Sequence, residues 1–113
     1  MHVSSTVLDN AVALVQAEGS ANADEGVEPL FRAIGKAVEE RRNRLIIDLA
    51  KVTYLSSSAI GALLRAHVTY TREHWQYRIC GLNERVYTIL AITKLNRILS
   101  LQDTLDQARR SLA

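Results

Sequence analysis

Three consecutive serines, from Ser56 to Ser58, are the residues of this sequence whose type and spacing could do chemistry. They lie in "YLSSSAIGALL", between an apolar run typical of a strand and a run typical of a helix. A hydroxyl at such a junction can cap the helix, act as a nucleophile, help to cradle a phosphate, or become phosphorylated. Capping needs one hydroxyl and contributes about 1 kcal/mol, so it does not account for three.

A nucleophilic serine needs a neighbouring base, and no histidine of this sequence is placed to act on Ser56, Ser57 or Ser58. The histidines are His2, His67 and His74, and His67 lies roughly 15 Å along the helix that the serines begin. No GxSxG elbow is present, the scattered histidines and lone cysteine do not form a metal site, and "SSSAIG" lacks the lysine of a phosphate-binding loop. The sequence therefore predicts no catalytic residue, metal or cofactor, and favours a modification site or docking surface.

The length indicates one compact domain covering residues 1–113. The 48% hydrophobic and 23% charged residues are typical of a globular protein, and a net charge of +2 does not predict nucleic-acid binding. The most basic run, "RRNR" at 41–44, suits the end of a helix, where cations complement the helix dipole.

Cysteine content and the N-terminus predict a cytoplasmic location without membrane insertion. Cys80 has no second cysteine to pair with, and its apolar surroundings in "YRICGL" favour a buried thiol in a reducing compartment. The first residues, "MHVSSTVLDN", lack the features of a signal peptide, and no apolar run approaches the roughly 18 residues that span a bilayer.

The first half of the chain predicts a hairpin, a helix and a buried strand. The segment "VLDNAVALVQAEG" reads as two strands joined by a turn at Asp9-Asn10. An apolar stripe with Pro29 in its first turn predicts the helix, and "RLIIDLAKVTYL" predicts a strand covered on both faces, on which Tyr54 packs. The stripe consists of Val27, Leu30, Phe31, Ile34 and Val38.

The second half repeats the alternation of helix and strand. A helix from near Ser58 is expected to bury one stripe, "YRICGL" is a second buried strand, and Asn83 caps the next helix. A short strand in "NRILSL" and a helix from near Asp103 complete the chain. The stripe expected to be buried after the serines is Ile60, Leu63, Leu64, His67 and Val68. This order predicts an α/β fold with a mixed, mostly parallel sheet, an N-terminal hairpin and about four helices, with the serines at the carboxyl edge of the sheet.

The run "RLIIDLAKVTYLSSSAIGALL" resembles the signature region of the STAS domain of bacterial anti-sigma factor antagonists. That signature is a hydrophobic strand with an Asp-hydrophobic pair, followed by Asp-Ser-Ser-Gly-hydrophobic-Gly at the start of a helix. The downstream segment "RICGLNERVYTILAITKLNRILSLQDTLDQARRSL" is similar to the rest of the family. The resemblance covers nearly the whole chain and is strongest from Leu45 to Leu112.

The resemblance implies a role for each residue of the motif. The family's acidic residue falls on Ser56, its phosphorylated serine on Ser57, the next serine on Ser58, and its glycines on Ala59 and Gly61. Ser57 is then the phosphorylation site. The partner-binding residues implied by the resemblance are Asn22, Asp24, Ser56, Ser57, Ser58 and Ala59.

The function implied by the resemblance is partner switching without catalysis. Unphosphorylated protein binds an anti-sigma factor that is also a GHKL-type serine kinase; phosphorylation ends the binding, and a PPM-type phosphatase restores it. A phosphate adds about −1.5 to −2 charges, which a helix N-terminus tolerates, so the domain is expected to stay folded.

This chain departs from the family pattern at two positions. Ser56 stands in place of the acidic residue and Ala59 in place of a glycine. An alternative function is therefore a STAS subunit of a lipid ABC transporter or of a stressosome-like complex, where no phosphorylation is needed. A nucleotide-handling enzyme is a third reading.

Overall fold

The structure is a computed structural model that describes residues 1–21 and 24–112, and the side chains of residues 21, 24 and 25 lie outside that description. Strands and helices alternate along the described chain as the sequence predicts. In chain order they are β1 (His2–Val7), β2 (Ala13–Ala21), α1 (Asp24–Glu39), β3 (Arg44–Leu55), α2 (Ser57–Arg72), β4 (Gln76–Cys80), α3 (Glu84–Ile92), the 3-10 helix η1 (Leu95–Arg97), β5 (Leu101–Gln102) and α4 (Leu105–Ser111).

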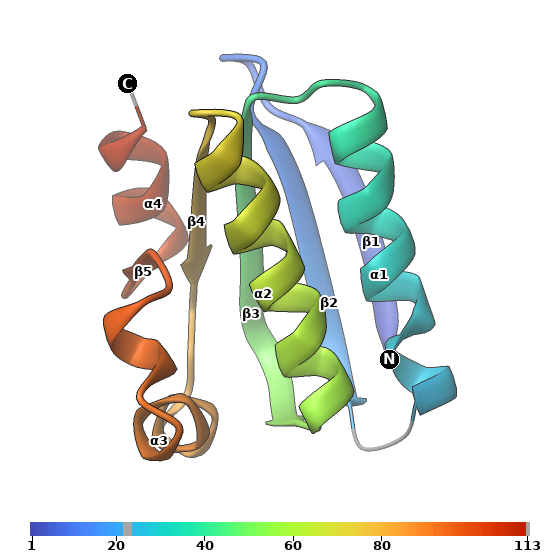
Figure 1. Cartoon of the computed structure of the whole chain (residues 1–113), viewed down its shortest axis with the longest axis vertical. Helices are drawn as coiled ribbons and strands as arrows, with labels where there is room; N and C mark the ends of the chain where they lie inside the picture. Colours follow the sequence, from blue (N-terminus) through green and yellow to red (C-terminus); the bar gives the residue numbers. More distant parts are fainter. Residues whose placement is uncertain (22–23, 113) are drawn as a thin grey trace.

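The strands form a mixed sheet in the order β1-β2-β3-β4-β5. β1 runs antiparallel to β2, and each of the other neighbouring pairs is parallel. The predicted hairpin and the mostly parallel sheet are therefore confirmed. Because β2, β3 and β4 are parallel, they run toward the same edge of the sheet, the lower edge in Figure 1, and α1, α2 and α3 begin near it. β4 stops at Cys80, opposite Asp48 in the middle of β3, and an unpaired segment continues to α3.

Hydrophobic side chains pack on both faces of the sheet. On one face α1, α2 and α3 contribute Leu30, Leu63 and Leu90 to the larger cluster. On the other face Ala108 of α4 joins a smaller cluster. Ile46 and Ile47, adjacent in β3, are both fully buried, as expected of a strand that is covered on its two faces.

Helix α2 is turned relative to the orientation that its apolar pattern predicts. Ile60 and Leu64 are only half-buried and Val68 is 56% exposed. Tyr70 anchors the observed orientation, because it is buried and its hydroxyl donates a hydrogen bond to the Arg42 carbonyl at 2.7 Å. The buried face of α2 consists of Ala59, Ala62, Leu63, Ala66 and Tyr70.

Two smaller expectations are corrected. α1 begins at Asp24, so Pro29 lies inside the helix rather than in its first turn. The strand expected in "NRILSL" is reduced to β5, because Leu101 and Gln102 are the residues that pair with β4, while Leu95–Arg97 form η1.

Gly81 holds the chain close to β3 immediately after β4. Its φ of +77° lies in the left-handed region, which strongly favours glycine. A Cβ at this position would lie 2.9 Å from the Ala50 Cβ, the Ala50 nitrogen and the Asp48 Oδ1. Both the backbone conformation and the close approach of β3 therefore require glycine here.

Replacing Gly81 with alanine is expected to lower the free energy of unfolding by about 2–4 kcal/mol, through left-handed strain and steric overlap. Urea denaturation measures the change. Gly35→Ala is the matched control, since a Cβ at Gly35 meets no atom within 4 Å and alanine is the better helix former. This control should gain up to about 1 kcal/mol, and equal stabilities of the two variants would contradict the account.

Candidate protein-binding site

The triple serine lies where β3 ends and α2 begins, at the lower edge of the sheet in Figure 1. At that end β3 pairs with β2 as far as Leu55, whereas β4 pairs with Arg44–Asp48 at the other end of β3. Leu55, the last residue of β3, is buried, and α2 starts at Ser57. The serines therefore directly follow a paired, buried strand end and do not lie in a long loop.

The three hydroxyls have different surroundings. Ser56 is the N-cap of α2, and its Oγ accepts a hydrogen bond from the Ala59 N–H at 3.2 Å. Ser58 is half-buried, whereas Ser57, the first residue of the helix, is exposed. Ser56 therefore caps the helix, and the Ser57 side chain faces solvent at the positive end of the helix dipole.

The two glycine positions of the family motif fall on opposite sides of α2. The Ala59 side chain is fully buried in the core, so its methyl group cannot contact a partner, contrary to expectation. Its helical position places it on the face that packs on the sheet. Gly61 faces outward, and a Cβ built there would meet no atom within 4 Å. The backbone of α2 is therefore open to close approach at Gly61.

The start of α3 lies beside the same strand end. Asn83 caps α3 through its Oδ1, which accepts from the Val86 N–H at 2.8 Å, while its Nδ2 donates to the Val52 carbonyl of β3 at 2.9 Å. This side chain thus ties the α3 N-terminus to β3, in agreement with the predicted cap. Two helix N-termini, those of α2 and α3, are held close to the end of one strand.

Tyr54 belongs to this edge, which sequence reasoning missed. It was expected to pack on the sheet, but it is 41% exposed and lines a shallow groove with Glu84, Arg85, Thr88 and Ile89 of α3. The pairing of β2 with β3 shifts register twice, so simple alternation does not predict which face Tyr54 occupies. The only sequence signal was an aromatic residue directly before the serines.

Two further residues, Asn22 and Asp24, are expected at this surface from the sequence. Asn22 lies outside the described residues. Asp24 is the first residue of α1, and its side chain lies outside the description. The described part of the candidate site is therefore the β3–α2 junction together with the start of α3.

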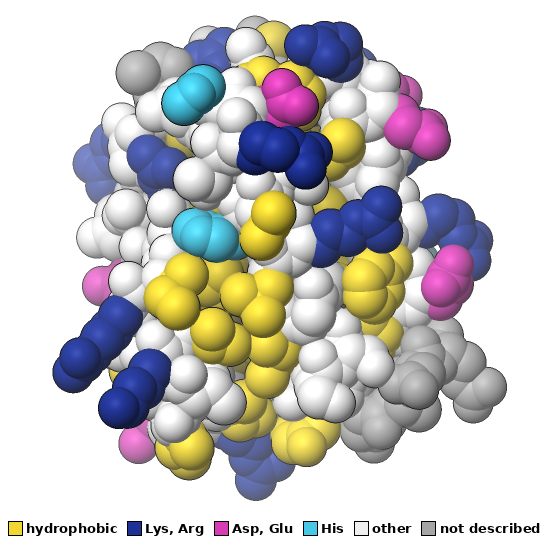
Figure 2. Space-filling model, in the orientation of Figure 1, with side chains coloured by type: hydrophobic (Ala, Val, Ile, Leu, Met, Phe, Trp, Pro, Cys, Tyr) yellow, Lys and Arg dark blue, Asp and Glu magenta, His cyan; other side chains and the backbone are white. Residues whose placement is uncertain are grey.

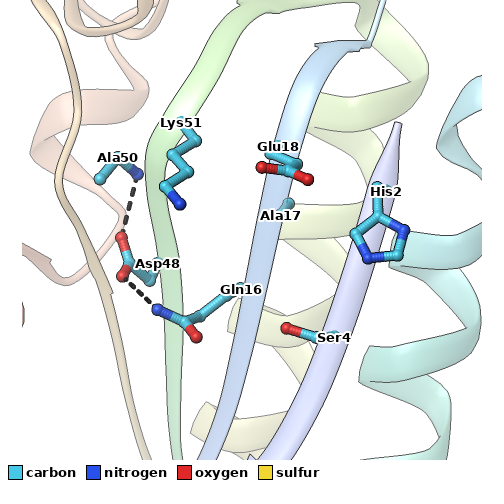
Figure 3. Close-up of a pocket in the computed structure, with 8 residues that line it drawn as sticks. All are labelled: His2, Ser4, Gln16, Ala17, Glu18, Asp48, Ala50 and Lys51. Carbon is cyan, nitrogen blue, oxygen red and sulfur yellow. Dashed lines mark hydrogen bonds between the residues drawn. The ribbon is translucent and has the colours of Figure 1, made fainter.

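A separate cavity of about 250 Å³ lies against β1, β2 and β3. Figure 3 shows Gln16 and Asp48 pointing toward one another from neighbouring strands, with Lys51 above them. Asp48 is only 8% exposed, and its carboxylate accepts hydrogen bonds from the Gln16 Nε2 at 3.0 Å and the Ala50 N–H at 2.9 Å. The Gln16 bond joins β2 to β3 and the Ala50 bond lies within β3, so the contacts of Asp48 are those of a structural residue.

Other reactive side chains are engaged in the fold. Burial, and secondarily the charge of Asp48, raises the pKa of the Cys80 thiol to about 12, which disfavours a nucleophilic thiolate. His67 Nδ1 lies 2.7 Å from the Tyr77 hydroxyl, which also accepts from the Ser100 N–H. In the described ranges no three His, Cys, Asp or Glu side chains are grouped to hold a metal ion. No described helix is long and apolar enough to cross a membrane.

The fold and the site together define a small sheet-and-helix module with an exposed serine at the start of its central helix. The sequence matches the STAS domain family over residues 20–108, and the chain belongs to that family.

Solved structures of similar fold include proteins from several bacteria. An anti-sigma factor antagonist of Mycobacterium paratuberculosis is 25% identical, with a TM-score of 0.79 over 98% of this chain and 94% of that one. A candidate anti-sigma factor antagonist of Thermotoga maritima is 17% identical, with a TM-score of 0.85 over 97% and 93% of the two chains. The phosphorylated form of SpoIIAA from Bacillus is 12% identical, with a TM-score of 0.75 over 97% and 98%.

The division of roles among the serines can be tested by stability. Ser56→Ala removes the acceptor of the Ala59 N–H and should cost about 1 kcal/mol of unfolding free energy, whereas Ser57→Ala should change it by less than about 0.5 kcal/mol. Ser56→Asp should stay near the wild-type value, because a carboxylate caps as well as a hydroxyl. Thermal and urea denaturation measure these differences, and a larger loss for Ser57→Ala than for Ser56→Ala would reverse the assignment.

Proposed function

We propose that this chain, as one domain over residues 1–113, is an anti-sigma factor antagonist that acts in the cytoplasm by binding rather than by catalysis. Its partner is an anti-sigma factor that is also a GHKL-type serine kinase, docked on the β3–α2 junction around Ser56, Ser57 and Ser58. Transfer of the γ-phosphate of ATP to the Ser57 hydroxyl ends the binding, and hydrolysis by a PPM-type phosphatase restores it.

The observation that carries this proposal is the exposure of Ser57 beside a neighbour that already caps the helix. A kinase has to reach the acceptor hydroxyl without unfolding the substrate. Ser56 holds the helix start through the Ala59 N–H, so modification of Ser57 removes no hydrogen bond that maintains the cap.

Electrostatics allow a phosphate at this position. The first turn of α2 contains no acidic residue, and the helix dipole favours an anion at its N-terminus. A phosphate on Ser57 adds about −1.5 to −2 charges at neutral pH. The charge of the docking surface therefore changes while the scaffold that presents it is retained, as a reversible switch requires.

Relatives support the same reading. The chain belongs to the STAS domain family, and the Mycobacterium paratuberculosis protein that is 25% identical is an anti-sigma factor antagonist. Bacillus SpoIIAA, which shares the fold, has been solved in a phosphorylated form. Ser56 replaces an acidic residue of the motif, but it supplies the cap that an aspartate would also supply.

The test is incubation of the purified protein with its cognate anti-sigma factor, ATP and Mg²⁺. Intact mass and peptide mapping should find one phosphate, on Ser57. Ser57→Ala should remain unmodified and bound, Ser58→Ala is the matched control that should still be modified, and Ser57→Glu should weaken binding at least about tenfold, or about 1.4 kcal/mol.

Three results would count against the proposal. A phosphate on Ser58 would move the acceptor site by one residue. Unchanged binding by Ser57→Glu would remove the switch. No phosphorylation, combined with co-purification of an ABC transporter or of a stressosome-like complex, would instead favour the STAS subunit that needs no phosphate.

A further inference from the structure

The two edge strands of the sheet differ in how they are protected from pairing with another chain. Among the described residues β1 pairs with β2 alone, through six consecutive residue pairs without a bulge. The opposite edge strand, β5, consists only of Leu101 and Gln102. Natural sheets protect an edge by shortening the strand, by a bulge, or by placing Lys or Pro on it. β5 is short, whereas β1 has none of these features.

The outer side of β1 is also not covered by α1. Val3, Ser5 and Val7 point toward the helix, because the β2 residues that pair with them belong to the larger core cluster. Val3 is half-buried against that cluster, but Ser5 is exposed and Val7 is 51% exposed. A strand can therefore approach β1 from outside without displacing α1.

A cavity of about 290 Å³ lies between α1 and this part of β1. Ser5 and Val7 line it from β1, and the small Ala33 and Ala37 line it from α1. The charged residues of its lining are Lys36, Glu40 and Arg42. The fold by itself thus leaves apolar surface exposed beside the edge, and a strand added next to β1 would remove part of it from water.

The charges at this edge do not oppose a second copy of the chain. β1, "HVSSTV", contains no Asp, Glu, Lys or Arg, so two β1 strands side by side bring no like charges together. Figure 2, oriented as Figure 1, shows side chains of both signs on the flank over α1, where Glu28 and Arg32 form an ion pair. An identical surface therefore meets charges of both signs rather than one repelling field.

The sequence of β1 complements itself in one antiparallel register. A two-fold axis perpendicular to the sheet at Ser5 places Ser5 of one copy opposite Ser5 of the other, Val7 opposite Val3, and Thr6 opposite Ser4. The valines then contact each other on the α1 side, and the hydroxyls can bond on the other side. An axis at Ser4 would instead leave Val7 with no strand residue opposite it.

We infer that β1 is the interface of a homodimer, in which two β1 strands pair antiparallel and join the sheets of two copies into one. The same short sequence supplies both members of every cross-strand pair, which favours a second copy over an unrelated strand. This inference does not depend on the proposed function. Ser57 follows β3, which is separated from β1 by β2, so both copies keep it accessible. The dimer would present two docking sites that point in opposite directions.

The first measurement is the mass of the wild-type protein by sedimentation equilibrium over a range of concentrations. One chain has a mass of 12.6 kDa, and the expected assembly is a dimer without larger species, because a two-fold interface closes on itself. A protein that stays monomeric at about 0.5 mM, or that forms open-ended assemblies, would overturn the inference.

The same substitution at two similarly exposed valines locates the interface. Val7 is 51% exposed and Val68, on α2, is 56% exposed. Val7→Lys removes both valine contacts of the dimer and places a charge on the edge, so the dissociation constant should rise at least about tenfold. Val68→Lys should change it by less than about twofold. Circular dichroism verifies that both variants are folded, and equal effects of the two substitutions would overturn β1 as the interface.

Two variants of Ser5 test the register. Ser5→Lys and Ser5→Glu each place like charges opposite one another at the two-fold axis, and each alone should weaken the dimer at least about fivefold. An equimolar mixture places lysine opposite glutamate and should form heterodimers, an advantage that shrinks at high salt. A mixture that dimerises no better than its separate components would overturn the pairing of Ser5 with Ser5.

Another occupant of the β1 edge would give a different result. A wild-type monomer whose binding to the anti-sigma factor is lost in Val7→Lys but kept in Val68→Lys would assign the edge to a strand of that partner and overturn the homodimer. Failure of the kinase to modify Ser57, with the dimer present, would overturn the proposed function and leave this inference standing.

Discussion

The pairing of β3 with parallel strands on both sides is the constraint on which the rest of the structure depends. It directs β2, β3 and β4 toward one edge of the sheet, and the helices that follow them begin near that edge. The Asn83 side chain strengthens the arrangement by bonding to the Val52 carbonyl while it caps α3. A surface for another protein can therefore be assembled from segments far apart in sequence without any long loop.

The hydrogen bond between the Ser56 Oγ and the Ala59 N–H means that neighbouring serines have different roles at the start of α2. One hydroxyl satisfies the helix, and the next is exposed to solvent. A helix N-terminus also has unsatisfied N–H groups and a positive dipole, so a negative group there does not oppose the fold. This is the physical reason that a covalent charge at Ser57 can alter a surface without melting the element that carries it.

The alanines on the inner face of α2 determine what remains outside. Ala59, Ala62 and Ala66 are fully buried, and Tyr70 fixes the helix through the Arg42 carbonyl. With those residues facing the sheet, the larger Ile60 and Leu64 are only half-buried and Val68 is exposed. The Ala59 methyl group is accommodated within the core, whereas Gly61 keeps the outer side open.

The sequence by itself determined the order and kind of the helices and strands, because these depend on local periodicity, caps and turn residues: the Asp9-Asn10 turn, the stripe from Val27 to Val38, the continuous apolar run of β3 and the Asn83 cap. It also located three hydroxyls at a strand–helix junction. Only the tertiary structure decided which serine caps the helix, that Ala59 is buried, that Tyr54 reaches the surface and which face of α2 meets the sheet. Those outcomes depend on register shifts between β2 and β3 and on how closely a helix approaches a sheet, and both are set by contacts between residues distant in the chain.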